Sequence, residues 1–181
     1  MGKMYWNNGE RHEGEWKNDR ADGEGIRYFP DGDRYEGDYK NGLSEGKGVY
    51  YYSEGDMYEG QFVNDGRREG KGTFCYINGD RYEGDWKNDK KEGKGIYYLK
   101  NGDRYEGDFI NDNFEGRGIY YYSNGDRYEG EFKNDEFEGK GIKINLGGIN
   151  IILCQALGFS KLGNSFIDSV LNKSIDVKFD I

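Results

Sequence analysis

Basic residues recur at two fixed positions along this 181-residue chain, where they could bind phosphate groups. One set lies between two glycines, and the other precedes a repeated tyrosine position. The first set is Lys47, Lys71, Lys94, Arg117 and Lys140, and the second is Arg11, Arg34, Arg81, Arg104 and Arg127. The formal net charge of −9 opposes attraction to nucleic acid or to anionic lipid. We therefore expect no nucleic-acid partner, and a phospholipid head-group site is only an alternative.

Residues suited to metal binding or catalysis are sparse. The acidic run from Asp31 to Asp38 lacks the glycine and terminal glutamate spacing of an EF-hand calcium loop. His12 is the only histidine, and Cys75 and Cys154 match no metal or disulfide spacing. No serine or cysteine lies in a recognisable nucleophile motif, and the Gly-x-Gly pairs lack the lysine and hydroxyl residue of a phosphate loop. We expect no metal, no cofactor and no enzymatic activity.

The basic and acidic residues are carried by a strict repeat. Tyr-Glu-Gly occurs at residues 35, 58, 82, 105 and 128, and His12-Glu13-Gly14 is an imperfect sixth copy. The spacings are 23, 23, 24, 23 and 23 residues. A period of this kind indicates one small structural unit that is copied along the chain and packs on its neighbours. Residues 1–145 are predicted to form this array, and residues 146–181 a separate segment.

Each repeat is predicted to be a β-hairpin. Two runs of strand-forming residues are separated by turn residues, and Asn-Gly or Asp-Gly closes one end of most copies. A three-residue loop at residues 123–125 with Gly125 left-handed places Tyr120 opposite Tyr128 and Gly118 opposite Gly130. The same register pairs opposite charges, namely Arg117 with Glu131, Lys94 with Asp108 and Lys71 with Asp85. The predicted fold is all-β, an elongated antiparallel array of about six hairpins.

This register gives the sheet one aromatic face and one charged face. On the charged face, the arginines before the tyrosine position lie opposite Tyr28, Cys75, Tyr98 and Tyr121, where the rings can accept cation–π contacts.

We predict that the aromatic face lines a concave groove, which suits a helix, an extended peptide or a second copy of the chain. A regular ladder of rings could also stack sugars, which is a less favoured alternative. The candidate groove residues are Tyr35, Tyr39, Tyr50, Tyr58, Phe62, Phe74, Tyr82, Trp86, Tyr97, Tyr105, Phe109, Tyr120, Tyr128 and Phe132.

The repeat resembles the MORN repeat, the membrane occupation and recognition nexus. Residues 82–88, Tyr-Glu-Gly-Asp-Trp-Lys-Asn, followed by Gly-Lys-Gly-Ile-Tyr at 93–97, carry the resemblance most closely, and it extends over residues 5–145. Copy one departs from the pattern at His12 and Arg27, and copy six at Lys143. The resemblance implies an extended antiparallel ribbon that serves as a scaffold, an interaction module or a dimerisation element.

Residues 146–181 lack tyrosine and abandon the repeat. Asn164 could cap a helix, and residues 175–181 alternate as in a half-buried strand. The segment is predicted to be a small helix and strand that cap the last hairpin, or else a partner-binding or dimerising element; a readthrough artefact is a third alternative. Its candidate interaction residues are Phe166, Ile167, Val170, Leu171, Ile175, Val177 and Phe179.

Together these features predict a non-enzymatic scaffold that binds a protein partner, or itself, through the aromatic groove and the tail. The alternative is a peripheral membrane module that binds phospholipid head groups. The cysteine usage and the lack of an apolar leader favour the cytoplasm, with any link to the cytoskeleton or to membranes made through a partner.

Overall fold

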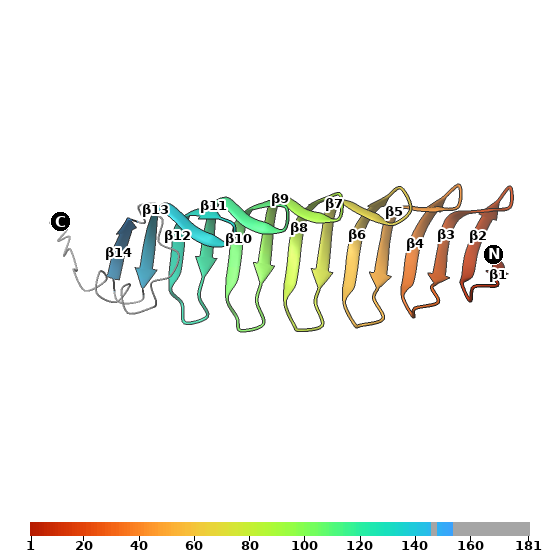
Figure 1. Ribbon diagram of the computed structural model, residues 1–181, viewed down its shortest axis with the longest axis horizontal. Coiled ribbons are helices and arrows are strands. Elements are labelled where there is room, and N and C mark those ends of the chain that lie inside the picture. Colours follow the sequence, from red (N-terminus) through yellow and green to blue (C-terminus); the bar gives the residue numbers. More distant parts are fainter. Residues whose placement is uncertain (146–147, 154–181) are drawn as a thin grey trace.

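The computed structural model describes residues 1–145 and 148–153 of the chain. They form one sheet of 14 antiparallel strands whose spatial order is the sequence order, so the fold is a continuous meander (Figure 1). The strands are β1 (Gly2–Tyr5), β2 (Arg11–Lys17), β3 (Arg20–Tyr28), β4 (Arg34–Lys40), β5 (Leu43–Tyr51), β6 (Met57–Val63), β7 (Arg67–Cys75), β8 (Arg81–Lys87), β9 (Lys90–Tyr98), β10 (Arg104–Ile110), β11 (Asn113–Tyr121), β12 (Arg127–Lys133), β13 (Glu136–Asn145) and β14 (Gly148–Leu153).

One edge of the ribbon is made of tight turns. In β10–β11, Ile110 pairs with Asn113, so only Asn111 and Asp112 form the turn, with φ angles of 50° and 76°. Two consecutive positive φ angles define a type I′ turn, and asparagine and aspartate tolerate this conformation. The β6–β7 turn has the additional residue Gly66, because Val63 pairs with Arg67. This insertion accounts for the single 24-residue spacing.

The other edge carries longer loops. The amide of Gly125 donates to the carbonyl of Tyr122 at 3.0 Å, and Gly125 has a φ of 90°. Tyr120 pairs with Tyr128, Gly118 with Gly130 and Arg117 with Glu131, as the sequence predicts. The predicted loop and its register are therefore confirmed.

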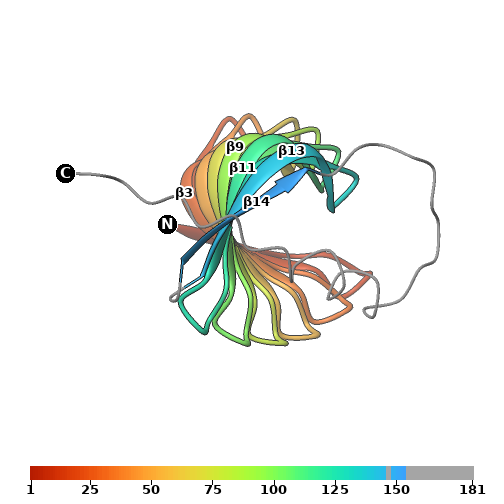
Figure 2. The same cartoon turned by 90° about the vertical axis from the view of Figure 1, so that its left-hand side faces the viewer.

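In each tight-turn hairpin of the repeats, the pairing register shifts beside the central glycines, which marks a β-bulge. Between β10 and β11, Gly107 pairs with Gly118 but Asp108 pairs with Glu115, so Gly116 and Arg117 form a bulge. Bulges bend the bulged strand and increase its twist. Seen end-on, the strands are curved rather than flat, and successive hairpins fan around the long axis (Figure 2).

Aspartates join each repeat to the one before it. At the tight turns, Asp89 Oδ1 accepts the amide of Arg68 at 2.8 Å, while the amide of Asp89 donates to the carbonyl of Arg68 at 3.1 Å. At the long loops, Asp80 accepts from the amide of Lys100 at 2.8 Å and from the hydroxyl of Tyr97 at 3.1 Å. Burial opposes ionisation of Asp80, but the hydrogen bonds from Lys100 and its other partners lower its pKa overall. Both edges of the ribbon are thus fastened from repeat to repeat.

The sheet continues beyond the predicted domain boundary at residue 145. β14 pairs with β13, and Ile151 lies opposite Ile142. At the other end, β1 pairs with β2. The helix and strand predicted within residues 164–181, with all seven candidate interaction residues of the tail, lie outside the described residues.

Candidate functional site

The repeated tyrosine is a core residue that covers the central glycines. Tyr35 is 1% exposed, and its hydroxyl donates to the carbonyl of Asp38 at 3.1 Å. A Cβ atom added to Gly48 would stand 2.5 Å from that hydroxyl and 2.6 Å from the ring. Glycine is therefore required wherever the ring lies flat on the neighbouring backbone.

A second aromatic residue, four positions later on the same strand, closes over the first. The rings of Tyr105 and Phe109 meet edge to face with centroids 5.3 Å apart. Tyr105 also meets Phe132 of the next repeat at 4.8 Å. Four residues of a straight strand span about 13 Å, so this contact requires the strand to bend towards the aromatic face. The resulting ladder of edge-to-face pairs holds one repeat against the next.

The predicted aromatic groove is consequently filled by its own side chains. Three of the 14 candidate residues, Tyr50, Tyr97 and Tyr120, keep partial exposure, and the other 11 are buried. A partner could contact these three half-buried rings, but the buried rings offer almost no surface. The buried candidates are Tyr35, Tyr39, Tyr58, Phe62, Phe74, Tyr82, Trp86, Tyr105, Phe109, Tyr128 and Phe132.

One position of the aromatic face varies along the array. It is the residue that pairs with the second aromatic residue across the tight-turn hairpin. From the first repeat to the last, its side chain changes from small to cationic and then to aromatic. In order along the chain, it is Ala21, Ser44, Arg68, Lys91, Phe114 and Phe137. This gradient was not predicted from the sequence, although it is visible when the six repeats are written beneath one another.

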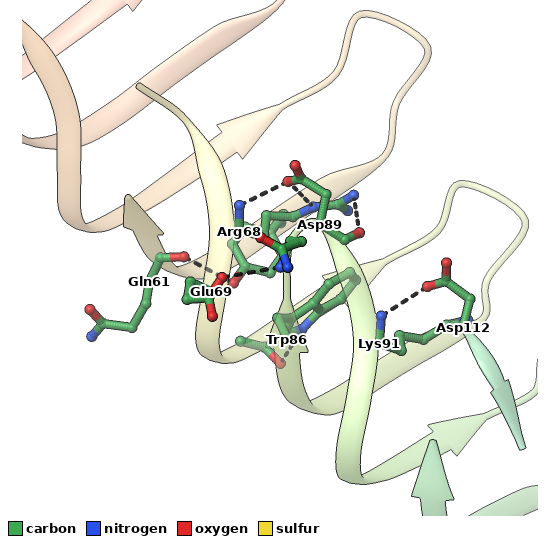
Figure 3. Close-up of polar contacts among 10 residues, drawn as sticks. Gln61, Arg68, Glu69, Trp86, Asp89, Lys91 and Asp112 are labelled. Atoms are coloured by element: carbon green, nitrogen blue, oxygen red, sulfur yellow. Dashed lines mark hydrogen bonds and ion pairs between the residues drawn. The ribbon is translucent and has the colours of Figure 1, made fainter. Parts of the chain in front are cut away.

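The two cations of this position, Arg68 and Lys91, lie beside Trp86 (Figure 3). The guanidinium of Arg68 stacks 4.5 Å from the Trp86 ring and contacts Asp89 Oδ1 at 3.3 Å. The ammonium of Lys91 lies 4.8 Å from the centroid of Tyr97. Burial lowers the pKa of Lys91, with attraction to Asp112 opposing the shift. These cations hold the ladder together by cation–π contact.

His12 replaces the tyrosine in the first repeat and is 1% exposed. Its ring meets Tyr39 edge to face at 4.5 Å, but its Nε2 has no hydrogen-bond partner. Burial, and then repulsion from Arg27, lowers its pKa. The histidine therefore packs in the core as an aromatic ring whose neutral form is favoured by burial.

An open groove lies on the opposite face and runs along the ribbon from β1 to β13. Its two sections share Lys71, Glu83 and Gly84, so it is continuous. We call it the charged-face groove. One row of its lining, which we call the floor, alternates the glutamate of Tyr-Glu-Gly with an aliphatic residue or threonine from the adjacent strand. The row is Glu13, Ile26, Glu36, Val49, Glu59, Thr73, Glu83, Ile96, Glu106, Ile119, Glu129 and Ile142.

Charge is unevenly distributed along the charged-face groove. The N-terminal section is lined by six carboxylates and three lysines, whereas the C-terminal section has four carboxylates and four basic side chains. The ammonium groups of Lys71 and Lys94 contact Asp85 and Asp108 at 2.7 Å and 2.6 Å. These two predicted cross-strand ion pairs are confirmed, so these lysines are already paired within the sheet.

The arginines that precede the repeated tyrosine stack on tyrosine rings beside this groove. Arg104 lies opposite Tyr98, as expected from the register, but its guanidinium stacks on Tyr121 at 4.2 Å. Both tyrosines flank Arg104 in the register, but the guanidinium turns to the strand of its own tight-turn hairpin. Arg81 and Arg34 behave likewise, on Tyr98 at 4.4 Å and Tyr51 at 4.1 Å.

Within residues 1–145 and 148–153, no three histidine, cysteine or acidic side chains are arranged to hold a metal ion. The same described residues contain no helix with the length and apolar character needed to cross a membrane.

Solved structures share this ribbon architecture. The TCP domain of SAS-4 from Drosophila melanogaster, in complex with a proline-rich motif of Ana2, aligns with a TM-score of 0.55 and 15% identity over 83% of this chain and 81% of that one. The TCP10c domain of Sas-4 from the same organism aligns with a TM-score of 0.50 and 13% identity, over 82% and 89% of the two chains. At these identities the likeness concerns the fold alone.

No curated protein sequence matches this chain. The family model described as MORN repeat matches six consecutive segments, residues 12–34, 35–57, 58–81, 82–104, 105–127 and 128–144. These segments coincide with the hairpins of the sheet, and their length matches the spacing of the Tyr-Glu-Gly motif. The chain therefore belongs to the MORN repeat family.

Proposed function

We propose that this protein is a non-enzymatic scaffold that holds an extended segment of a partner protein in the charged-face groove. The observation that carries the proposal is the contrast between the two faces. On the aromatic face, 11 of the 14 candidate rings are buried, whereas the charged face carries an open groove lined by exposed or half-buried glutamates and aliphatic side chains.

The composition of the groove suits a peptide. Its row of alternating carboxylates and aliphatic side chains offers hydrogen-bond acceptors and apolar contact in a regular order. The fold relative from Drosophila melanogaster was solved with a proline-rich motif of a second protein, which is consistent with this kind of partner. The formal net charge of −9 weighs against the alternative of a phosphate-binding stripe for lipid head groups.

Two finer expectations remain part of the proposal. Tyr50, Tyr97 and Tyr120 could add contacts on the aromatic face, and residues 146–181 could contribute to partner binding or to self-association. We place the protein in the cytoplasm, where a partner would set its position.

Selection of random peptides on the full-length protein tests the function. The affinities of selected peptides are then measured on V49W/I96W, which fills the groove, and on L43W/I110W, which adds the same rings at exposed sites outside it. We expect V49W/I96W to lose about ten-fold or more in affinity, because bulky side chains exclude the peptide, and L43W/I110W to bind as wild type. Equal binding by both double variants would overturn the proposal.

A further inference from the structure

We propose that the segment bound in the charged-face groove is a basic polyproline II helix, with lysine or arginine at every third residue. This inference rests on the proposed function and names the chemistry of its partner. It follows from the spacing of the groove floor, its composition and its charge.

The spacing of the floor matches one conformation of an extended chain. Glutamates occur on every second strand, and strands lie about 4.8 Å apart, so successive glutamates are about 9.6 Å apart along the ribbon axis. A polyproline II helix has three residues per turn and rises about 3.1 Å per residue, which gives about 9.3 Å per turn. Every third side chain of such a helix therefore meets the next glutamate with little drift over several repeats.

The repeat lengths of other peptide conformations match the spacing of the glutamates less well. A β-strand repeats its side-chain direction every two residues, or about 6.6 Å, so its third residue points away from the floor. An α-helix returns to the same face after seven residues, or about 10.5 Å, and drifts by about 1 Å at every repeat. The polyproline II period is the closest of the three, and it requires no hydrogen bonds from the sheet.

The residues between the glutamates suit the rest of a proline-rich segment. Val49 and Thr73 separate Glu36, Glu59 and Glu83 on the floor and are half-buried. Proline rings between the basic residues would pack on these side chains, as apolar rings do on aliphatic surface.

The negative charge of the groove favours a basic partner, and its uneven distribution determines where along the groove the basic residues bind. The N-terminal section has twice as many carboxylates as lysines, and both kinds of side chain form ion pairs, for example Lys3 with Glu13 at 2.8 Å and Glu83 with Arg81 at 2.8 Å. Exposed ion pairs of this kind contribute little, so a glutamate such as Glu36, 3.8 Å from Arg34, can accept a second cation. The basic residues of the partner would lie over residues 13–84, and its less charged part over the balanced C-terminal section.

The probe is the labelled peptide (Lys-Pro-Pro)5, compared with a peptide of the same composition in which five lysines precede ten prolines. Binding to the full-length protein is measured by fluorescence anisotropy at two salt concentrations. We expect the regularly spaced peptide to bind at least about ten-fold more tightly than the block peptide, because only its charges match the glutamate period.

The triple variant E36Q/E59Q/E83Q should weaken binding of (Lys-Pro-Pro)5 by about ten-fold. The matched control E15Q/E54Q/E136Q removes the same charge from residues outside the groove and should bind as wild type. Equal affinity for the two peptides, or an equal loss in both triple variants, would show only general attraction of cations and overturn the inference. If selected peptides occupy the groove by the tryptophan test but lack this spacing, the inference fails while the proposed function stands.

Discussion

The hydroxyl of Tyr82 donates to the carbonyl of Asp85 at 2.8 Å, while its ring lies over Gly84 and Gly95. This arrangement joins the three features of the repeat: the tyrosine, the glycines and the bend. The hydrogen bond crosses the bend and satisfies both the buried hydroxyl and the carbonyl that it faces. The stability of the ribbon should therefore depend on the ring, on the hydroxyl and on the space that each glycine leaves.

Gly48→Ala should lower the free energy of unfolding by about 1–3 kcal/mol. The added methyl group would overlap the ring and hydroxyl of Tyr35, and a closely packed core cannot absorb it without a shift of the backbone or ring. Urea unfolding followed by tyrosine fluorescence measures the change. The exposed substitution Glu54→Ala should be nearly neutral, and an equally stable Gly48→Ala protein would contradict the proposed packing.

His12→Tyr should raise the free energy of unfolding by about 1 kcal/mol. Tyrosine would restore the hydrogen bond from its hydroxyl to the carbonyl three residues later, which Tyr35, Tyr82 and Tyr105 all make. It also removes the unpartnered Nε2 from the core. Thermal and urea unfolding would show the gain, and His12→Phe, which fits the site without a hydroxyl, should gain less.

The wild-type protein should lose stability relative to His12→Phe as the pH falls below about 6.5. Burial lowers the pKa of folded His12 below its ordinary value of 6.5, so the unfolded state binds the proton first. The contribution of His12 to the free energy of unfolding is therefore complete above pH 6.5. It decreases as the pH falls towards the pKa of His12 in the folded protein. Urea unfolding of both proteins is measured between pH 7.5 and about 5. Because the two proteins have the same carboxylates, the difference between their stabilities reports on His12 alone. A constant difference across this range would disagree with a buried neutral histidine.

Asp89→Gly should be less stable than Asp19→Gly by about 1–2 kcal/mol. Both residues occupy the second position of a tight turn, with φ of 67° and 60°, so glycine relieves the same turn strain in each. Asp89 additionally accepts the amide and guanidinium of Arg68 from the preceding repeat, whereas Asp19 makes no such bond to the described part of the chain. The difference between the two variants in urea unfolding measures the link between repeats. Equal stabilities would mean that the link contributes nothing.

Stability should fall steeply above pH 10. Burial raises the pKa of Tyr76 to about 12, and it raises the pKa of Tyr58, Tyr82 and Tyr105 further above their ordinary value of 10.0. As the pH rises, the unfolded state loses these protons first. The contribution of the buried tyrosines to the free energy of unfolding is therefore complete below pH 10, and it decreases as the pH rises towards their pKa values in the folded protein. Tyr105→Phe should reduce the slope of stability against pH by about 1.4 kcal/mol per pH unit, the value for one proton. If the slope were the same in Tyr105→Phe and the wild type, Tyr105 would be exposed to solvent in the folded protein, which would contradict its burial.

Much of the ribbon could be predicted from local sequence. The Tyr-Glu-Gly period indicated the number of hairpins, and the opposite charges of Lys71 and Asp85 selected the register that the sheet adopts. Strand pairing between neighbours in sequence depends on turn residues and alternation, which are both local properties. Arg104 lies opposite Tyr98 as predicted, but Tyr121 flanks it equally in the register, so the sequence could not indicate that the guanidinium stacks on Tyr121.

The sequence by itself determined that the chain is an array of hairpins with one aromatic and one charged face, because side-chain alternation along a strand has a period of two residues. The tertiary structure decided which face is open. The bulge at Gly116 and Arg117 bends β11, and on the paired strand β10 the rings of Tyr105 and Phe109 touch and cover much of the aromatic face. A bend of this kind depends on the packing of several repeats, so alternation alone could not reveal that the open groove lies along the glutamates.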